Sequence, residues 1–199
     1  IEDDHILVSI GVEGNSNGFG LKSIGVDLGE NQHIKVNENG QTNIDNIYAV
    51  GDVTGPPWLA HVSSSEGLYV VEYIANLNPK KIDYDCIPAC TYSKPEIGSI
   101  GFDQNTLDDK GINYKIAKSF FNANGRAVAS GSTDGFIKIL VSDDNLILGA
   151  HIIGSNATEM ISEFSLAMSN QLTVENILGS VHPHPTFSEA IFETLMQLK

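Results

Sequence analysis

The sequence predicts an α+β protein, built on an antiparallel sheet with helices packed against it. Two apolar, strand-like runs at residues 136–141 and 146–153 flank the polar segment 142–145, which is typical of a hairpin with a four-residue loop. Other strand-like runs lie close by in the sequence, and strands connected this closely tend to pair antiparallel. Directly after the hairpin, apolar residues recur at helical spacing over residues 157–168, so we expect a helix there.

The first 80 residues are expected to form short strands and turns, followed by one helix. Strand-like runs occupy residues 6–10, 33–36 and 47–50, and a loop rich in Gly and Asn occupies residues 11–20. Apolar residues at helical spacing then predict a helix over about residues 59–76.

A domain boundary is predicted where the segment NPKK at residues 78–81 interrupts this helical pattern. Proline and glycine-rich or polar segments of this kind commonly separate domains. We therefore expect one domain at residues 1–80 and a second at residues 81–199.

The second domain begins with strands and ends with helices. Strand-like runs lie at residues 91–92, 97–102 and 114–120, and a short helix at residues 104–110 is expected to end at Gly111. After the hairpin, Asn156 has the position of an N-cap, with Glu159 three residues further on. The apolar stripe of the helix that follows consists of Ala157, Met160, Ile161, Phe164 and Met168.

The charge of the chain argues against several classes of partner. The formal net charge is −14, from 25 acidic and 11 basic residues, and a charge of this sign repels nucleic acid backbones and anionic membranes. No apolar run approaches the roughly 18 residues of a membrane span, and no signal peptide is recognisable. The excess of acid is explained equally by solubility or by a surface for a basic protein partner.

Two cysteines, Cys86 and Cys90, are expected to be reduced structural thiols. Their spacing is neither C-x-x-C nor part of a four-ligand zinc set, and a secreted disulfide framework would use more cysteines. The histidines show no metal-ligand spacing beyond the pair His182 and His184, so no metal is predicted. Reduced thiols are typical of a cytoplasmic or mitochondrial matrix protein.

The segment VHPHPTFSEAIFETL at residues 181–195 carries the first candidate site. Each proline fixes its own φ and disfavours the α region for the residue before it, so His182 and His184 are held outside any helix. Thr186 and Glu189 have the spacing of a capping box, which makes Glu189 a structural residue. Alternatively, Glu189 orients the imidazole of His184, as a carboxylate does for a general base.

A second candidate site lies at Asp52, which follows the strand-like run 47–50 and precedes a helix. In open α/β sheets, ligands bind outside the carboxyl ends of strands and at helix N-termini, where backbone N–H groups are free to donate. An aspartate in this position can instead simply cap a turn. The local sequence does not decide between these two interpretations.

Three segments together resemble the C-terminal part of the dihydrolipoamide dehydrogenases, which are flavin-dependent pyridine nucleotide-disulfide oxidoreductases. The segments are TNIDNIYAVGDVTGPPWLAHVSSSEG (42–67), CTYSKPEIGSIG (90–101) and HIIGSNATEMISEFSLAMSNQLTVENILGSVHPHPTFSEAIFETL (151–195). The segment ILVSIGVEGNSNGFGLKSIGVDL (6–28) extends the resemblance over essentially the whole chain. Glutathione and trypanothione reductases share the HPT and the glutamate, and they remain the second possibility.

The resemblance implies a fold and two cofactors. Residues 1–80 would be a strand and helix remnant of the FAD-binding domain, and residues 81–199 a dimerisation (interface) domain. Asp52 would bind the ribityl chain of FAD, and the backbone at the helix start would meet the edge of the flavin; those backbone positions are Leu59, Ala60 and His61. The parent enzyme would use NAD as its second cofactor.

The resemblance also implies a catalytic role for the histidine arm. His184 would be the base for the dithiol substrate, oriented by Glu189, and Pro185 would follow a cis peptide bond. The histidine of one subunit would serve the redox disulfide of the other, so a homodimer is required. We expect the dimer contact to use the helix 191–198 together with the stripe on residues 157–168. Further partners would be the dihydrolipoyl domain and acyltransferase core of a 2-oxoacid dehydrogenase complex.

The chain also departs from this family. No G-x-G-x-x-G loop follows a strand, and the redox C-x4-C pair is absent, because Cys86 and Cys90 lie elsewhere in the chain. The chain opens at Ile1 close to a strand-like run, so we expect it to be part of a longer protein, inactive by itself. The alternative function, from a different class, is a non-catalytic dimerisation or partner-binding module.

Overall fold

The computed structural model describes residues 3–199, which divide into two units between Ile82 and Asp83. No helix within these residues combines the length and the apolar character needed to cross a membrane.

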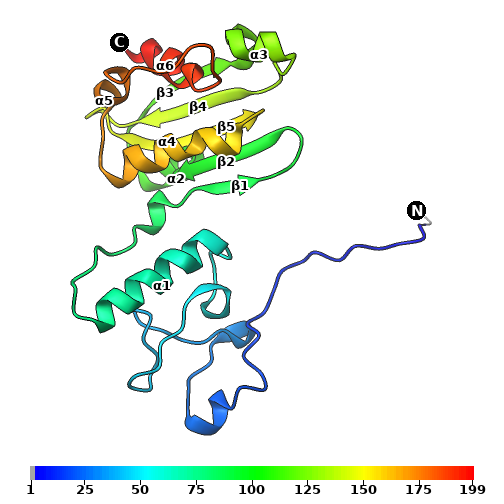
Figure 1. The fold of residues 1–199 in the computed structure, drawn as a ribbon, viewed down its shortest axis with the longest axis vertical. Helices are drawn as coiled ribbons and strands as arrows, with labels where there is room; N and C mark the ends of the chain where they lie inside the picture. Colours follow the sequence, from blue (N-terminus) through cyan, green and yellow to red (C-terminus); the bar gives the residue numbers. More distant parts are fainter. Residues whose placement is uncertain (1–2) are drawn as a thin grey trace. The chain divides into compact units, whose positions relative to one another are not determined.

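The second unit contains one antiparallel sheet of five strands (Figure 1). The strands are β1 (Ala89–Thr91), β2 (Glu96–Gly101), β3 (Lys115–Phe120), β4 (Phe136–Val141) and β5 (Ile147–Gly154), in the spatial order β1-β2-β5-β4-β3. The predicted hairpin is the centre of the sheet, since β4 pairs with β5 and each then pairs with one further strand. The predicted α+β fold is therefore confirmed.

Strand alternation makes one face of the sheet apolar. Ile137 lies opposite Ile152 and Ile139 lies opposite Ala150, and all four side chains are at most 1% exposed. Ser119 and Gly98 continue the first of these rows across β3 and β2, so they lie on the same face. This face is the one that the helices cover.

Two helices cover this face. Helix α4 (Ala157–Ser169) packs on β2 and β5, and α6 (Glu189–Leu195) packs on β3 and β4 (Figure 1). The approach of α4 requires glycine at position 98, because a Cβ there would lie 2.5 Å from the carbonyl oxygen of Ala157. Helix α6 is linked to β3 by a hydrogen bond between the hydroxyls of Thr194 and Ser119.

The stripe on α4 is buried within its own unit. Ala157, Ile161 and Phe164 are at most 1% exposed, and on α6 Ile191 and Leu195 are fully buried. These side chains belong to the hydrophobic core, so they have no surface left for a second subunit. A dimer contact on residues 157–168 and 191–198 therefore remains a prediction, and it would have to use exposed side chains of these segments such as Leu166 (64%) and Met196 (43%).

The N-terminus of α4 is capped by a residue from another element. Asn156 is the N-cap as predicted, but it has a left-handed backbone (φ 63°), and its side chain makes no capping hydrogen bond. The carboxylate of Glu96 on β2 accepts hydrogen bonds from the backbone N–H and the hydroxyl of Thr158, at 3.2 Å and 2.8 Å. A carboxylate at this end of a helix also interacts favourably with the helix dipole.

The remaining helices of the second unit are short. Helix α2 (Gln104–Lys110) ends at Gly111, which has φ 64°, as the sequence predicts. Two further helices, α3 (Gly125–Ser130) and α5 (Val174–Leu178), were not predicted. Single turns of 3₁₀ helix lie at Tyr84–Cys86, Phe121–Ala123 and Met196–Leu198.

The first unit has one helix and little sheet structure. Helix α1 (Ala60–Ile74) confirms the predicted helix, and single 3₁₀ turns lie at Leu21–Ile24, Glu30–Gln32 and Gly51–Thr54. The strands predicted at residues 6–10, 33–36 and 47–50 are not formed within the described residues. Only isolated bridges occur, Leu28 with Ile34 and Gln41 with Tyr48. A strand requires a neighbour for its backbone groups, and residues 6–10 have none in this unit.

The two units differ in how much apolar surface they bury. In the first unit the described buried apolar side chains are Val26, Ile34, Val62 and Val70, whereas many large apolar side chains are exposed, among them Ile6 (88%), Leu7 (92%) and Leu68 (62%). The second unit has an extended core that spans the sheet and both covering helices. Local stability follows buried apolar contact, so the second unit should open less often.

We expect native-state hydrogen exchange to show strong protection in β4, β5 and α4 and weak protection across residues 3–82. The reason is the difference in buried apolar surface between the two units. Exchange followed by mass spectrometry on the intact chain measures both units in the same sample. Equal protection of α1 and α4 would contradict this expectation.

Candidate functional site

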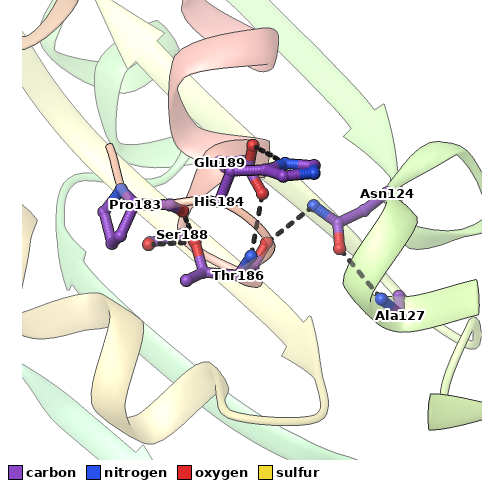
Figure 2. A network of polar contacts seen from close by, with 7 residues as sticks. All are labelled: Asn124, Ala127, Pro183, His184, Thr186, Ser188 and Glu189. Atoms are coloured by element: carbon purple, nitrogen blue, oxygen red, sulfur yellow. Dashed lines mark hydrogen bonds and ion pairs between the residues drawn. The ribbon is translucent and has the colours of Figure 1, made fainter. Parts of the chain in front are cut away.

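The arm that carries both histidines, residues 181–188, connects α5 to α6. It has no regular secondary structure, and the His184–Pro185 peptide bond is cis, as the resemblance implied. Figure 2 shows His184 and Glu189 side by side at the start of α6, with Thr186 below them. The structure therefore brings the two predicted residues of the first candidate site together.

The imidazole of His184 is bound at one nitrogen and exposed at the other. Its Nδ1 lies 2.8 Å from Oε1 of Glu189, and the side chain is 78% exposed, against 23% for Glu189. An ionised carboxylate only accepts hydrogen bonds, so Nδ1–H is the donor. In the neutral ring the lone pair is then on Nε2, which makes this nitrogen the one that can take a proton.

Glu189 binds the backbone of the arm as well as the imidazole. Its Oε2 accepts a hydrogen bond from the N–H of Thr186 at 2.8 Å. This N–H and the His184 ring, in that order, hold the pKa of the Glu189 carboxyl below its usual range. One half of the predicted capping box is thus formed; the other half is not, because the N-cap is Ser188.

Hydrogen bonds of Thr186 connect the arm to the rest of the unit. Its hydroxyl donates to the carbonyl of Pro183 at 2.7 Å and lies 2.8 Å from Oγ of Ser188. Its carbonyl accepts a hydrogen bond from Nδ2 of Asn124 at 3.1 Å (Figure 2). Asn124 is 1% exposed, and its Oδ1 accepts the N–H of Ala127, so it also caps α3.

The other histidine of the arm, His182, lies in a different environment. Its side chain is 9% exposed, and its Nε2 lies 2.9 Å from Oε1 of Glu163 on α4. Its ring centroid is 6.0 Å from that of Phe192 on α6. No local sequence pattern indicates Glu163 or Asn124 as neighbours of the arm, because both lie far from it in sequence.

A pocket of about 480 Å³ opens beside the arm. It is lined by Leu178, Gly179, Ser180, Val181, His182, Glu189, Phe192 and Glu193. Partial burial, together with the charge of Glu189, raises the pKa of the Glu193 carboxyl. The pocket thus combines two carboxyl groups with apolar side chains, and it adjoins the His184 site through Glu189.

The second candidate site, at Asp52, lies in the first unit. Asp52 is exposed within the 3₁₀ turn Gly51–Thr54, and this turn packs on α1. Gly51 donates its N–H to Oε2 of Glu66 at 2.7 Å; it has φ 76°, and a Cβ there would lie 2.4 Å from Oγ of Ser63. Glycine at position 51 thus allows the turn that presents the Asp52 carboxylate.

The N-terminus of α1 lies within the same unit as Asp52. The helix begins at Ala60, and the N-cap residue Leu59 provides no side-chain hydrogen bond to it. Leu59 is half-buried, whereas Ala60 and His61 are exposed. An exposed carboxylate and an uncapped helix N-terminus suit the hydroxyl groups and the carbonyl edge of a flavin nucleotide, so these residues fit FAD.

Both cysteines are thiols that take no part in a disulfide. Burial is the main cause that raises the pKa of the Cys90 thiol, which makes it a poor nucleophile. Within residues 3–199 no group of three or more His, Cys, Asp or Glu side chains is arranged to hold a metal ion.

Two sequence families match the chain. Residues 87–195 match the family described as pyridine nucleotide-disulphide oxidoreductase, dimerisation domain. Residues 1–67 match the family described as pyridine nucleotide-disulphide oxidoreductase. The first match covers the whole of the five-stranded sheet and the histidine arm.

Individual proteins match over almost the full chain. A dihydrolipoyl dehydrogenase of Bacillus subtilis is 44% identical over 194 residues, which are 97% of this chain and 41% of that protein. The mitochondrial dihydrolipoyl dehydrogenase of Caenorhabditis elegans is 42% identical, over 97% of this chain and 39% of its own length. The chain thus spans about two fifths of the relatives that it matches.

Among solved structures, LpdA from Mycobacterium tuberculosis superposes on the chain with a TM-score of 0.89. The sequences are 26% identical, and the match covers 94% of this chain and 41% of that protein. Its coverage includes most of both units of the present chain.

We expect acid to loosen the arm as Glu189 takes up a proton. Since the pKa of Glu189 is lowered in the folded protein, its stabilising contribution is complete above the unfolded value near 4.5 and is lost as the pH falls below it. The protection of the Thr186 amide against exchange, measured by NMR relative to the intrinsic rate at each pH, should therefore fall below about pH 4.5.

Glu189→Gln is the control for this titration. The variant cannot titrate at position 189, so its Thr186 amide should show no transition in this pH range. A transition that is unchanged in Glu189→Gln would assign the effect to another group.

Proposed function

Because this chain belongs to the pyridine nucleotide-disulphide oxidoreductase family, we propose that it forms part of a dihydrolipoyl dehydrogenase. Residues 1–80 would supply the end of the FAD-binding domain, and residues 81–199 the dimerisation domain. The observation that supports this most is the His184–Glu189 pair on the dimerisation domain, with one ring nitrogen bound and the other exposed. The similarity of the chain to dihydrolipoyl dehydrogenases of other organisms supports the same proposal.

The chemistry proposed for His184 is proton removal from a dithiol. An ordinary thiol has a pKa near 8.5 and must become a thiolate before it can attack a disulfide. Nε2 of His184 takes this proton, while Glu189 keeps the ring in the required tautomer and stabilises the imidazolium that forms. Oxidation of the dithiol to a disulfide releases two electrons and two protons.

The electrons from the dithiol are accepted by parts of the enzyme other than His184. In the proposed enzyme, FAD and NAD together with a redox disulfide would supply the acceptors for this electron pair. Within this chain Asp52 would accept a hydrogen bond from a ribityl hydroxyl. The backbone at Leu59, Ala60 and His61 would lie at the flavin edge.

We propose a homodimer in which His184 of one subunit serves the redox disulfide of the other. The matched family is a dimerisation domain, and His184 is largely exposed, as a base that acts on a group of another chain must be. The two cysteines of this chain are not proposed as the redox pair, since burial disfavours the Cys90 thiolate. The wider partners would be the dihydrolipoyl domain and acyltransferase core of a 2-oxoacid dehydrogenase complex.

Neither alternative from the sequence is favoured. The relatives above are named dihydrolipoyl dehydrogenase, which does not support a glutathione-reductase-like enzyme. The match to a dimerisation domain is compatible with a non-catalytic module, but the hydrogen-bonded pair of His184 and Glu189 suits a base and therefore favours the enzyme. Bacterial and mitochondrial relatives agree with a bacterial cytoplasm or a mitochondrial matrix as the compartment.

In a full-length enzyme that contains this chain, His184→Gln should lower turnover of dihydrolipoamide by roughly 100-fold or more, the range for losing a general base. Glu189→Gln should cost less, because it removes orientation and leaves the base in place. The turnover of both variants is measured from the steady-state rate of NADH formation. Near-normal turnover of a correctly dimeric His184→Gln enzyme would reject the proposed role.

We expect the chain by itself to bind FAD weakly, with a dissociation constant above the micromolar range. Asp52 and the start of α1 would contact only the flavin and ribityl end, and the sequence offers no G-x-G-x-x-G loop for the diphosphate. Fluorimetric titration with FAD measures this affinity, and Asp52→Asn should weaken it further. Micromolar or tighter binding would contradict the expectation.

A further inference from the structure

His182 differs from His184 in nearly every physical respect, although one proline separates them. Its side chain is 9% exposed against 78%, and it faces α4 and α6 of its own unit. Glu163 of α4 lies 2.9 Å from its Nε2, and the ring of Phe192 on α6 lies next to it, with 6.0 Å between centroids. The function proposed for His184 makes no use of this arrangement.

The hydrogen bonding shows that His182 is not a second base. An ionised Glu163 only accepts, so Nε2–H donates to it. The other nitrogen, Nδ1, is buried and has no hydrogen-bond partner among the described residues. A buried nitrogen is poorly placed to exchange a proton with a substrate, whereas the contact of Nε2 with Glu163 holds the ring against α4.

The residue that His182 holds in place is His184. Pro183 lies between them with its φ fixed by the ring, so a fixed His182 limits where the backbone of His184 can lie. On the other side of His184, Thr186 is fastened by Asn124 and Glu189, at 3.1 Å and 2.8 Å. The exposed imidazole is thus anchored on both sides in sequence.

We propose that His182 and Glu163 form a positioning pair that fixes the backbone of His184 for proton transfer. The proposal rests on the proposed function, and it adds two residues to it. General base catalysis demands a placement of the base within hydrogen-bond reach of the proton, and small displacements are costly. Glu163 supplies this placement from α4, whose own position is set by the sheet.

The test uses three variants of a full-length enzyme that contains this chain. Glu163→Ala removes the acceptor, Glu163→Gln keeps an acceptor oxygen, and Glu159→Ala removes an equal charge from an exposed position on the same helix. We expect Glu163→Ala to lower kcat by roughly 10-fold with little change in the KM for NAD, as for a misplaced catalytic group. Glu163→Gln should restore most of kcat, and Glu159→Ala should resemble wild type.

A kcat for Glu163→Ala equal to that of Glu159→Ala would overturn the proposal. So would failure of Glu163→Gln to recover activity, since loss of charge alone would then explain the effect. Normal flavin absorbance and dimer mass in each variant confirm that the enzyme is assembled.

A second measurement decides the case if Glu163→Ala does not fold. In the wild-type chain, NMR should show His182 as the Nε2–H tautomer, with this proton slow to exchange, while the ring protons of His184 exchange rapidly. A rapidly exchanging His182, or the opposite tautomer, would overturn the pairing. The His184→Gln experiment judges the base separately, so its failure and the failure of the pair are distinguishable.

Discussion

The Glu189 carboxylate is the contact on which the geometry of the site depends. Its two oxygens bind different parts of the molecule, Oε1 the imidazole of His184 and Oε2 the backbone of Thr186. The first interaction sets which nitrogen of the ring carries the proton, and the second fixes the backbone that carries the ring. Because both depend on one ionised group, the protonation state of the ring and its position are coupled.

The rest of the second unit makes this contact rigid. Glu189 begins α6, and α6 is held on the sheet by the buried side chains of Ile191 and Leu195 and by the Thr194–Ser119 hydrogen bond. Helix α4 packs on the same face of the sheet, over β2 and β5, where Gly98 leaves room for its first turn. The core of the sheet is thus connected to His184, the proposed base, through α6 and Glu189.

Local patterns allowed part of this to be predicted from the sequence. The β4–β5 hairpin, the helix α1 and the pairing of His184 with Glu189 all depend on residues a short distance apart in the chain. The contacts of Glu96 with Thr158, Glu163 with His182 and Asn124 with Thr186 connect distant segments, and no spacing rule indicates them. The predicted strands of the first unit failed because a strand depends on a neighbour, which local sequence does not specify.

The alternation of proline with histidine in the arm has a consequence for association between molecules. Proline has no backbone N–H, so neither Pro183 nor Pro185 can donate to a neighbouring strand. Exposed backbone that retains its donors invites pairing with other chains, which leads to aggregation. The arm carries the 98% exposed Val181 at its start, and its proposed role requires access for a substrate. Its prolines thus disfavour its becoming the edge of an intermolecular sheet.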